Sequence, residues 1–261
     1  MALYAVRYDV HFTPREPIEV PGFTVKFLKS LIITHDSGDV VKSLILEGGA
    51  NKPIHLSPIM TSGKPLLSTS TVKLVPGVRY WFRLGTVCDE AKLPILNDFV
   101  MGLVEKFAEP LGIEVVSNHL EVLVNAPREF SVSILTPAVI KAKDSTLVKY
   151  PTLKELISSP IRVLGRALWE KYSINIPTTW TWRISSYYVM THAENRSLRV
   201  DMGDGRVVEG VVGRWGFRRV AKMPKYLEAV LAKALAVANA VGVGKSRAIG
   251  FGMTNITISK D

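Results

Sequence analysis

Gly242-Val-Gly-Lys-Ser-Arg-Ala-Ile-Gly-Phe-Gly-Met253 joins an Ala/Leu-rich segment to a segment that alternates apolar and polar residues. Apolar residues at three- and four-residue spacing predict a helix over 225–241, which the first glycine ends as a C-cap does. The alternation predicts a closing strand over 253–259. Glycines expose backbone N–H groups, and Lys245 and Arg247 add positive charge, so this connection is suited to holding phosphate groups. The alternative is a helix-to-strand connection that binds no ligand.

The Gly-Lys-Ser triplet of this segment does not fit a nucleotide-binding P-loop. A P-loop needs a glycine five residues before Gly244, and that position is Asn239. A P-loop also follows a strand and opens a helix, whereas the order here is reversed. These differences argue against an ATP or GTP site and leave a nucleic-acid backbone as the expected source of phosphates.

The composition points to a polyanionic partner. The 261 residues carry a formal net charge of +10 and are 47% hydrophobic, which excludes a disordered chain. Arginines and lysines gather between Arg183 and Lys225, where aromatic residues interleave with them. Guanidinium groups bind phosphates in a bidentate manner and stack on bases, so this region is a second candidate for contact with nucleic acid.

Other compositional features limit the possible classes of protein. The single cysteine, Cys88, excludes a disulfide framework and a thiolate metal site. The first residues predict a strand rather than a signal peptide, and no uncharged apolar run reaches the length of a membrane span. We therefore expect a cytoplasmic protein with no membrane partner. Glutamine is absent, which is a tendency of proteins from hot-growing organisms.

The hydrophobic periodicity divides the chain into two similar halves. The first half predicts strands over 3–12, 40–48, 53–60, 71–87 and 113–125 and helices over 23–35 and 93–107. The second half predicts strands over 129–136, 181–191, 197–202, 206–220 and 253–259 and helices over 152–172 and 225–241. This order predicts an α+β fold of two tandem ferredoxin-like (RRM-like) βαββαβ domains, with residues 1–125 in the first and 126–261 in the second.

The order helix, Gly-x-Gly, five residues, Gly-x-Gly, strand is one part of a pattern that runs along the whole chain. Its other parts are a basic helix over 23–35, the strand entry Lys52-Pro-Ile-His-Leu-Ser-Pro58, the restart Phe130-Ser-Val-Ser-Ile-Leu-Thr-Pro137, and Val211-Val-Gly-Arg-Trp-Gly-Phe217 before the last helix. The pattern resembles the CRISPR repeat-RNA processing endoribonucleases, the sixth CRISPR-associated family within the repeat-associated RNA-binding superfamily.

The resemblance implies a metal-independent endoribonuclease without a cofactor. Such an enzyme cuts precursor RNA within each repeat by attack of a 2′-hydroxyl, which leaves a 2′,3′-cyclic phosphate and a 5′-hydroxyl. This step needs a proton acceptor, a cation beside the phosphate and a proton donor. The implied partners are CRISPR repeat RNA, as precursor and as mature guide RNA, and a CRISPR interference complex, with a homodimer as a further option.

Four residues are candidates for catalysis. Lys52 matches the strand-entry lysine of the family, and Lys29 resembles the helix lysine of a branch that uses lysines and an arginine. His35 ends the first predicted helix, where interaction with the helix dipole is the alternative role. His55 is either catalytic or an outward-facing strand residue. Ile33 stands where other members carry a tyrosine, so their Tyr/His/Lys triad is incomplete here.

The resemblance also predicts an RNA-binding set around the glycine-rich loop, the first helix and the turn after Val211. Its members are Gly242, Gly244, Lys245, Arg247, Gly250, Gly252, Lys26, Arg214, Arg218 and Arg219. A cluster of Lys29, Lys52 and Arg247 would lower the pKa of a lysine and favour it as a base.

Two other functions remain open at this stage. Because the triad is incomplete, the protein could hold repeat RNA without cutting it. It could also be a structural subunit that coats guide RNA, although the glycine-rich loop after a complete second half favours the processing family.

Overall fold

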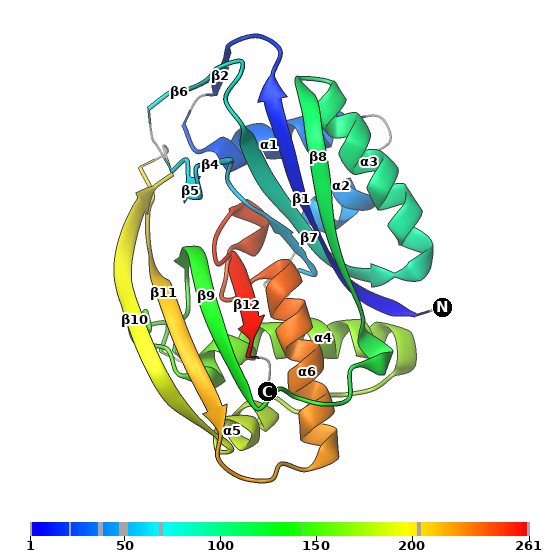
Figure 1. Cartoon of the computed structure of the whole chain (residues 1–261), viewed down its shortest axis with the longest axis vertical. Helices are drawn as coiled ribbons and strands as arrows, with labels where there is room; N and C mark the ends of the chain where they lie inside the picture. Colours follow the sequence, from blue (N-terminus) through cyan, green and yellow to red (C-terminus); the bar gives the residue numbers. More distant parts are fainter. Residues whose placement is uncertain are drawn as a thin grey trace.

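The computed structural model describes residues 2–20, 22–35, 39–46, 52–67, 70–142, 144–202 and 205–259. In the first half, β1 (Leu3–Pro14) lies between β7 (Tyr80–Asp89) and β8 (Ala108–His119), and every pairing is antiparallel. β3 (Ile54–Leu56) and β4 (Met60–Thr61) pair with the other edge of β7. Helices α1 (Thr24–Thr34) and α3 (Leu93–Glu105) complete a ferredoxin-like unit (Figure 1).

The second half repeats this topology. β9 (Glu129–Ala138) lies between β11 (Val207–Arg219) and β12 (Thr254–Ile258), and β10 (Tyr188–Asp201) forms the outer edge. α4 (Leu153–Tyr172) and α6 (Lys225–Val241) are its two long helices. The predicted α+β fold of two tandem ferredoxin-like domains is therefore confirmed.

Short elements decorate this framework. They are β2 (Ile18–Val20), α2 (Asp39–Leu46), β5 (Lys64–Pro65), β6 (Val72–Leu74), η1 (Glu90–Lys92), η2 (Leu120–Val122), α5 (Trp180–Ser185) and η3 (Arg247–Ile249).

Several predicted strands were wrong in their type or extent. Residues 40–46 of the strand predicted over 40–48 lie in helix α2, whose first turn begins with Asp39 and gains from the helix dipole. Residues 47–48 lie outside the described ranges. Gly77, at φ 79°, interrupts the strand predicted over 71–87 and separates β6 from β7. The strand predicted over 181–191 begins as α5, in which the Ser186 hydroxyl donates to the Arg183 carbonyl at 2.7 Å.

Two strand ends were also misplaced. The strand predicted over 113–125 begins at Ala108 and ends at His119, where η2 follows. Residues 188–191 of the strand predicted over 181–191 and residues 197–201 of the strand predicted over 197–202 belong to one strand, β10.

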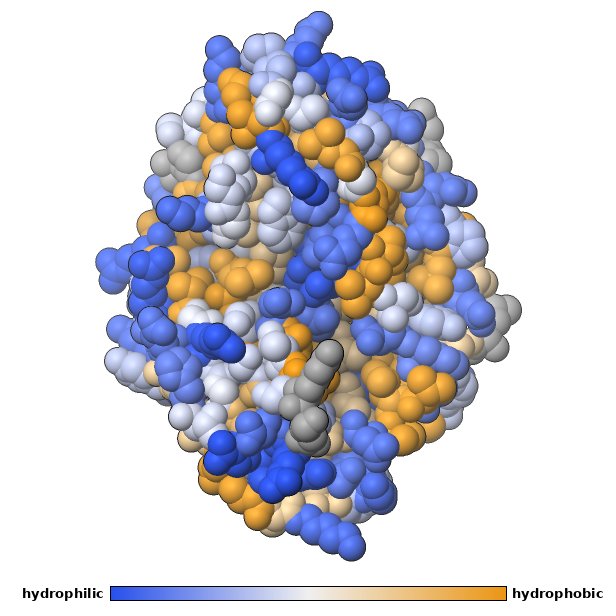
Figure 2. Space-filling view, viewed as in Figure 1, coloured by the Kyte–Doolittle hydropathy of each residue, from blue (hydrophilic) through white to orange (hydrophobic). Residues whose placement is uncertain are grey.

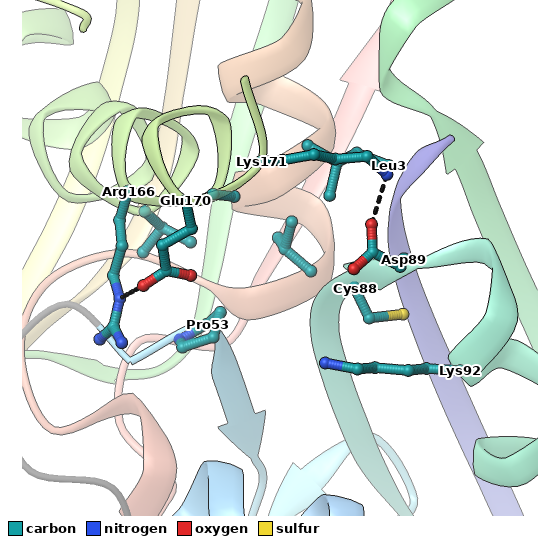
Figure 3. Close-up of a pocket in the computed structure, with 11 residues that line it drawn as sticks. Leu3, Pro53, Cys88, Asp89, Lys92, Arg166, Glu170 and Lys171 are labelled. Carbon is teal, nitrogen blue, oxygen red and sulfur yellow. Dashed lines mark hydrogen bonds and ion pairs between the residues drawn. The ribbon is translucent and has the colours of Figure 1, made fainter. Parts of the chain in front are cut away.

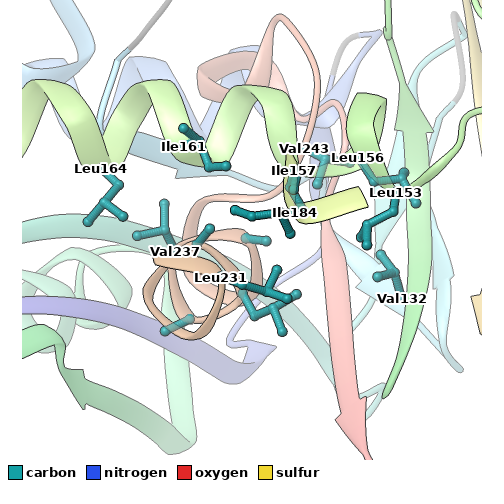
Figure 4. Packing of buried hydrophobic residues seen from close by; sticks show 14 of the residues in the cluster. Val132, Leu153, Leu156, Ile157, Ile161, Leu164, Ile184, Leu231, Val237 and Val243 are labelled. Carbon is teal, nitrogen blue, oxygen red and sulfur yellow. The ribbon is translucent and has the colours of Figure 1, made fainter. Parts of the chain in front are cut away.

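Helix α6 packs against both halves of the molecule. Leu231 and Val237 of α6 meet Ile157, Ile161 and Leu164 of α4 in the core of the second half (Figure 4). On its other side α6 lies so close to β7 that a Cβ atom on Gly85 would stand 1.8 Å from the Ala240 carbonyl oxygen. One helix therefore joins the core of the second half to the sheet of the first.

A buried ionic network reinforces this junction. The Arg83 guanidinium donates to both carboxylate oxygens of Asp9, at 2.6 and 2.8 Å, and to the Thr254 carbonyl at 2.7 Å. Arg7 donates to the side-chain oxygens of Asn239 and Asn255, at 2.9 and 3.2 Å. Charged side chains of β1 and β7 thus donate hydrogen bonds to groups of α6 and β12.

The apolar cores also cross the predicted domain boundary. Leu3, Ala5 and Val87 of the first half belong to the core of the second, and Val200 and Phe251 belong to the core of the first. The division into residues 1–125 and 126–261 remains a prediction about units of sequence. Within the described ranges, no helix combines the length and apolar character that crossing a bilayer requires.

Candidate functional site

The glycine-rich loop packs tightly inside the molecule. All four of its glycines are buried and have positive φ values between 71° and 93°. A Cβ atom on Gly252 would stand 1.9 Å from the Val243 carbonyl oxygen, and one on Gly250 would stand 2.5 Å from the Val25 side chain. Only glycine fits this backbone path, which brings the loop against α1 and the end of β9.

The backbone N–H groups of the loop are already used within the protein. Val243 donates to Gly252 at 2.8 Å, Lys245 donates to Val139 at 2.9 Å, and Gly252 donates to Pro137 at 2.9 Å. Gly244 donates to the Ser159 hydroxyl at 2.8 Å. Gly242, Gly244, Gly250 and Gly252 thus shape the loop, and their contact with RNA stays a prediction. Lys245 alone among the loop's predicted RNA ligands has an exposed side chain.

Arg247 is also an internal residue. It is 3% exposed, and its two terminal nitrogens donate to the Gly244 carbonyl at 3.0 Å and the Lys52 carbonyl at 2.9 Å. Burial and, secondarily, the charge of Arg162 lower its pKa to about 10, so it stays protonated at neutral pH. The side chain fastens the glycine-rich loop to the strand entry that carries Lys52. The contact between Arg247 and RNA stays a prediction.

His55 lies beneath the loop and is fully buried. Burial, followed by the charges of Arg83 and Arg247, lowers its pKa to about 3; the nearby Arg247 carbonyl opposes part of that shift. Neither ring nitrogen makes a hydrogen bond of good geometry. The outward orientation considered for His55 is wrong, because the side chain is buried, and its catalytic role stays a prediction.

Lys29 lies on α1, His35 follows the last residue of α1, and Lys52 comes two residues before β3. Thr24 in the first turn of α1 accepts a hydrogen bond from the Ile59 N–H at 3.0 Å, just past β3. The helix has eleven residues and is about 16 Å long. Lys52 and Lys29 are both half-buried.

His35 stands at the C-terminal end of α1. It is 7% exposed, and its ring packs edge-on against Phe99 of α3, with ring centroids 5.2 Å apart. A Cβ atom on Gly102 would stand 3.2 Å from its Nε2. Residues 36–38, which follow it, lie outside the described part of the chain.

The remaining predicted RNA ligands divide into paired and more accessible cations. The Lys26 amine donates to the Met202 carbonyl at 2.7 Å and joins α1 to β10, and Arg219 pairs with Glu228 at 2.9 Å. Arg218 is exposed but paired with Glu129. Arg214 is exposed on β11, beside Ser131 at 3.4 Å.

Arg214 also lines a pocket of about 400 Å³ on the sheet of the second half. Thr191, His192 and Thr257 are among the other residues of this pocket. Hydrophilic residues gather along the edge that β10 and β11 form (Figure 2). This sheet face offers side chains, rather than loop amides, to a polyanion.

A larger pocket of about 560 Å³ lies where the two halves meet (Figure 3). Pro53, which follows Lys52, lines it, and Lys92, Arg166 and Lys171 contribute cations. Sequence reasoning missed these three residues because they lie in segments far apart in the chain. The i,i+4 spacing of Arg162 and Arg166 on α4 was the available signal. Within the described ranges, no three His, Cys, Asp or Glu side chains are grouped to hold a metal ion.

The structure thus combines two ferredoxin-like units around a shared helix with a glycine-rich loop that is fastened to the segment carrying Lys52. The chain belongs to the Cas6 family of CRISPR-associated endoribonucleases. The family model of the Cas6 N-terminal domain matches residues 6–125, and that of CRISPR-associated endoribonuclease Cas6 matches residues 132–254.

Solved structures share the whole fold. Thermus thermophilus Cas6 is 15% identical with a TM-score of 0.64, and the alignment covers 98% of this chain and 99% of that one. A Cas6 product complex is also 15% identical, with a TM-score of 0.68 and coverage of 97% and 100%. The product of a Cas6-related gene from Pyrococcus furiosus is 14% identical, with a TM-score of 0.59 and coverage of 98% and 100%. No curated protein matches the sequence.

Proposed function

We propose that this CRISPR RNA-processing endoribonuclease cleaves repeat RNA without a metal ion. The ribose 2′-hydroxyl attacks the adjacent phosphorus, the bond to the 5′-oxygen breaks, and the products carry a 2′,3′-cyclic phosphate and a 5′-hydroxyl. The observation that carries this proposal is the contact between Arg247 and the Lys52 carbonyl, because it holds a lysine at a defined place beside the loop that characterises the family.

Lys52 and Lys29 are the proposed cations of the reaction. A lysine beside the scissile phosphate stabilises the negative charge that grows on its oxygens. His35 is the proposed proton donor or acceptor, since an imidazole changes its charge near neutral pH. Because His35 is 7% exposed and packs against Phe99, this role requires that its ring become accessible to RNA. His55 and Arg247 support this site from the interior and do not touch the substrate.

Lys245, Arg214 and Arg218 are the proposed RNA-binding residues, because their side chains are exposed. Repeat RNA, as precursor and mature guide, is the proposed partner, and the cytoplasm is the proposed location. One similar structure is a Cas6-RT-Cas1–Cas2 complex, which supports association with other CRISPR proteins. A homodimer is a further proposal.

A non-cleaving repeat-RNA binder is the second candidate function. The observation in its favour is Ile33, which occupies the position of the family's helix tyrosine and is 39% exposed on α1. An apolar side chain there can neither accept nor donate a proton.

Cleavage of labelled repeat RNA in excess EDTA separates the two candidates. We expect the wild-type protein to cut at one position and to leave a cyclic phosphate, and we expect Lys52→Ala to bind the RNA with little cleavage. Tight binding by the wild-type protein with no cleavage would instead support the non-cleaving function. Cleavage that EDTA abolishes would contradict the metal-independent mechanism.

A further inference from the structure

The 560 Å³ pocket between the two halves has the shape and chemistry of a nucleotide subsite. Its volume lies within the usual range for small-ligand sites, and α4 and the β7–η1 segment form opposing walls. Leu3, Pro53, Val87, Val163 and Ala167 provide apolar surface on which a base can pack. Cys88 contributes a neutral thiol, because burial raises its pKa to about 11.

The charges of the pocket favour a phosphate group. Its two carboxylates are already engaged: Glu170 pairs with Arg166 at 2.7 Å, and Asp89 pairs with Lys171. Lys92 adds a further, exposed cation from the wall opposite α4 (Figure 3). Arg162, one turn before Arg166, is exposed and close enough to lower the pKa of Arg247. The rim thus carries more positive than negative charge.

The pocket lies next to Lys52, so the phosphate expected in it belongs to the bound RNA. Pro53 lines the pocket and is bonded to Lys52, whose carbonyl is held by Arg247. A strand of RNA with its scissile phosphate at Lys52 therefore passes the mouth of this pocket. We propose that the pocket binds one nucleotide of the RNA segment next to the cut, with its base on the apolar wall and its phosphate between Lys92 and Arg166.

This proposal rests on the proposed function, and its test uses RNAs of different length. The cut position is mapped first with wild-type protein. Binding is then measured with a full-length repeat that carries a 2′-deoxy nucleotide at the cut, and with two shorter RNAs that lack either the 5′ or the 3′ flank.

Two variants should change the affinity in opposite directions. Lys92→Ala should weaken binding of the full-length RNA several-fold and reduce the slope of log Kd against log salt by about 0.7, the value for one lost contact with single-stranded phosphate. Glu170→Gln should tighten binding, because it removes a negative charge and releases Arg166. Neither variant should affect the shorter RNA that lacks the bound flank. Lys154→Ala is the matched control, since Lys154 is a cation at the other end of α4 that stacks on Trp182.

Equal effects of Lys92→Ala on all three RNAs, or no effect on any, would overturn the subsite. Binding of a free nucleoside monophosphate that full-length RNA does not displace would overturn the proposed subsite and indicate a separate ligand site. These results are distinguishable from failure of the proposed function, which would appear as absence of cleavage by the wild-type protein. Wild-type protein that bound none of the RNAs would contradict both.

Discussion

His55 lies between Arg83 and Arg247 in the protein interior, and this environment favours the neutral imidazole. The pKa falls from its ordinary value of 6.5 to about 3 on folding, so the unfolded chain binds the proton more strongly between those values. Stability should therefore decrease as the pH falls below 6.5, by up to roughly 1.4 kcal/mol per pH unit from this residue.

His55→Leu should remove that contribution and leave stability at neutral pH nearly unchanged, because neither ring nitrogen has a partner to lose. Urea unfolding from pH 7.5 to 4.5 measures the difference between variant and wild type. The difference should grow in favour of the variant toward low pH. A constant difference would contradict the burial of a neutral imidazole, and loss of cleavage by a stable variant would restore His55 as a catalytic candidate.

Arg247 and Lys245 are neighbours in the same loop with different expected roles. Arg247→Met removes the hydrogen bonds to Lys52 and Gly244, so we expect a lower melting temperature and a lower cleavage rate constant with nearly unchanged RNA affinity. Lys245→Ala should weaken RNA affinity without changing the melting temperature, since its side chain is exposed. Single-turnover cleavage and direct binding separate these effects. A weaker affinity for Arg247→Met without loss of stability would show that Arg247 contacts RNA.

The close packing of α6 against β7 depends on glycine at position 85, which has no side chain. Gly85→Ala places a methyl group 1.8 Å from the Ala240 carbonyl oxygen, so the helix must move away from the sheet. We expect a loss of about 3 kcal/mol in the free energy of unfolding, as for an overpacked core. Gly165→Ala in α4 is the control: its methyl group would meet only Ile176 at 3.7 Å, and it should stabilise the helix by about 0.5–1 kcal/mol. Similar denaturation midpoints for the two variants would contradict this account of the junction.

The long elements could be predicted from the sequence, and the short ones could not. Alternation along β1 and the three- and four-residue spacing in α6 arise from one buried face each, and this signal is local. Helix α2 has only eight residues, and α5 has six, so the tertiary surroundings decide their form.

The candidate site was only partly predictable for a related reason. Lys52 and the glycine-rich loop were identified by their motifs. The burial of His55 and Arg247 was not predicted, because it depends on segments almost 200 residues apart in sequence that come together only in the folded chain. Lys92 and Arg166, which line one pocket from different halves, were missed for the same reason.

The whole molecule should unfold as one unit despite its two halves. Asp9 is held by Arg83, which also bonds to Thr254 of β12, so the junction contains buried charges from the first half that need the second. Asp9→Asn removes the negative charge that faces Arg7 and Arg83, and we expect the free energy of unfolding to fall by roughly 3–5 kcal/mol. Hydrogen exchange of β1 and β11 amides measures whether both halves are destabilised. Destabilisation of β1 amides alone would show that the halves unfold independently.

The central claim is that this protein cuts repeat RNA by attack of the 2′-hydroxyl next to the scissile phosphate. A repeat RNA with a single 2′-deoxy nucleotide at the cut position tests it most directly, with the all-ribose RNA as the control and EDTA in both reactions. We expect both RNAs to bind equally and only the all-ribose RNA to be cut. Cleavage of the deoxy-substituted RNA at the same position would contradict it, because water or another group would then be the nucleophile.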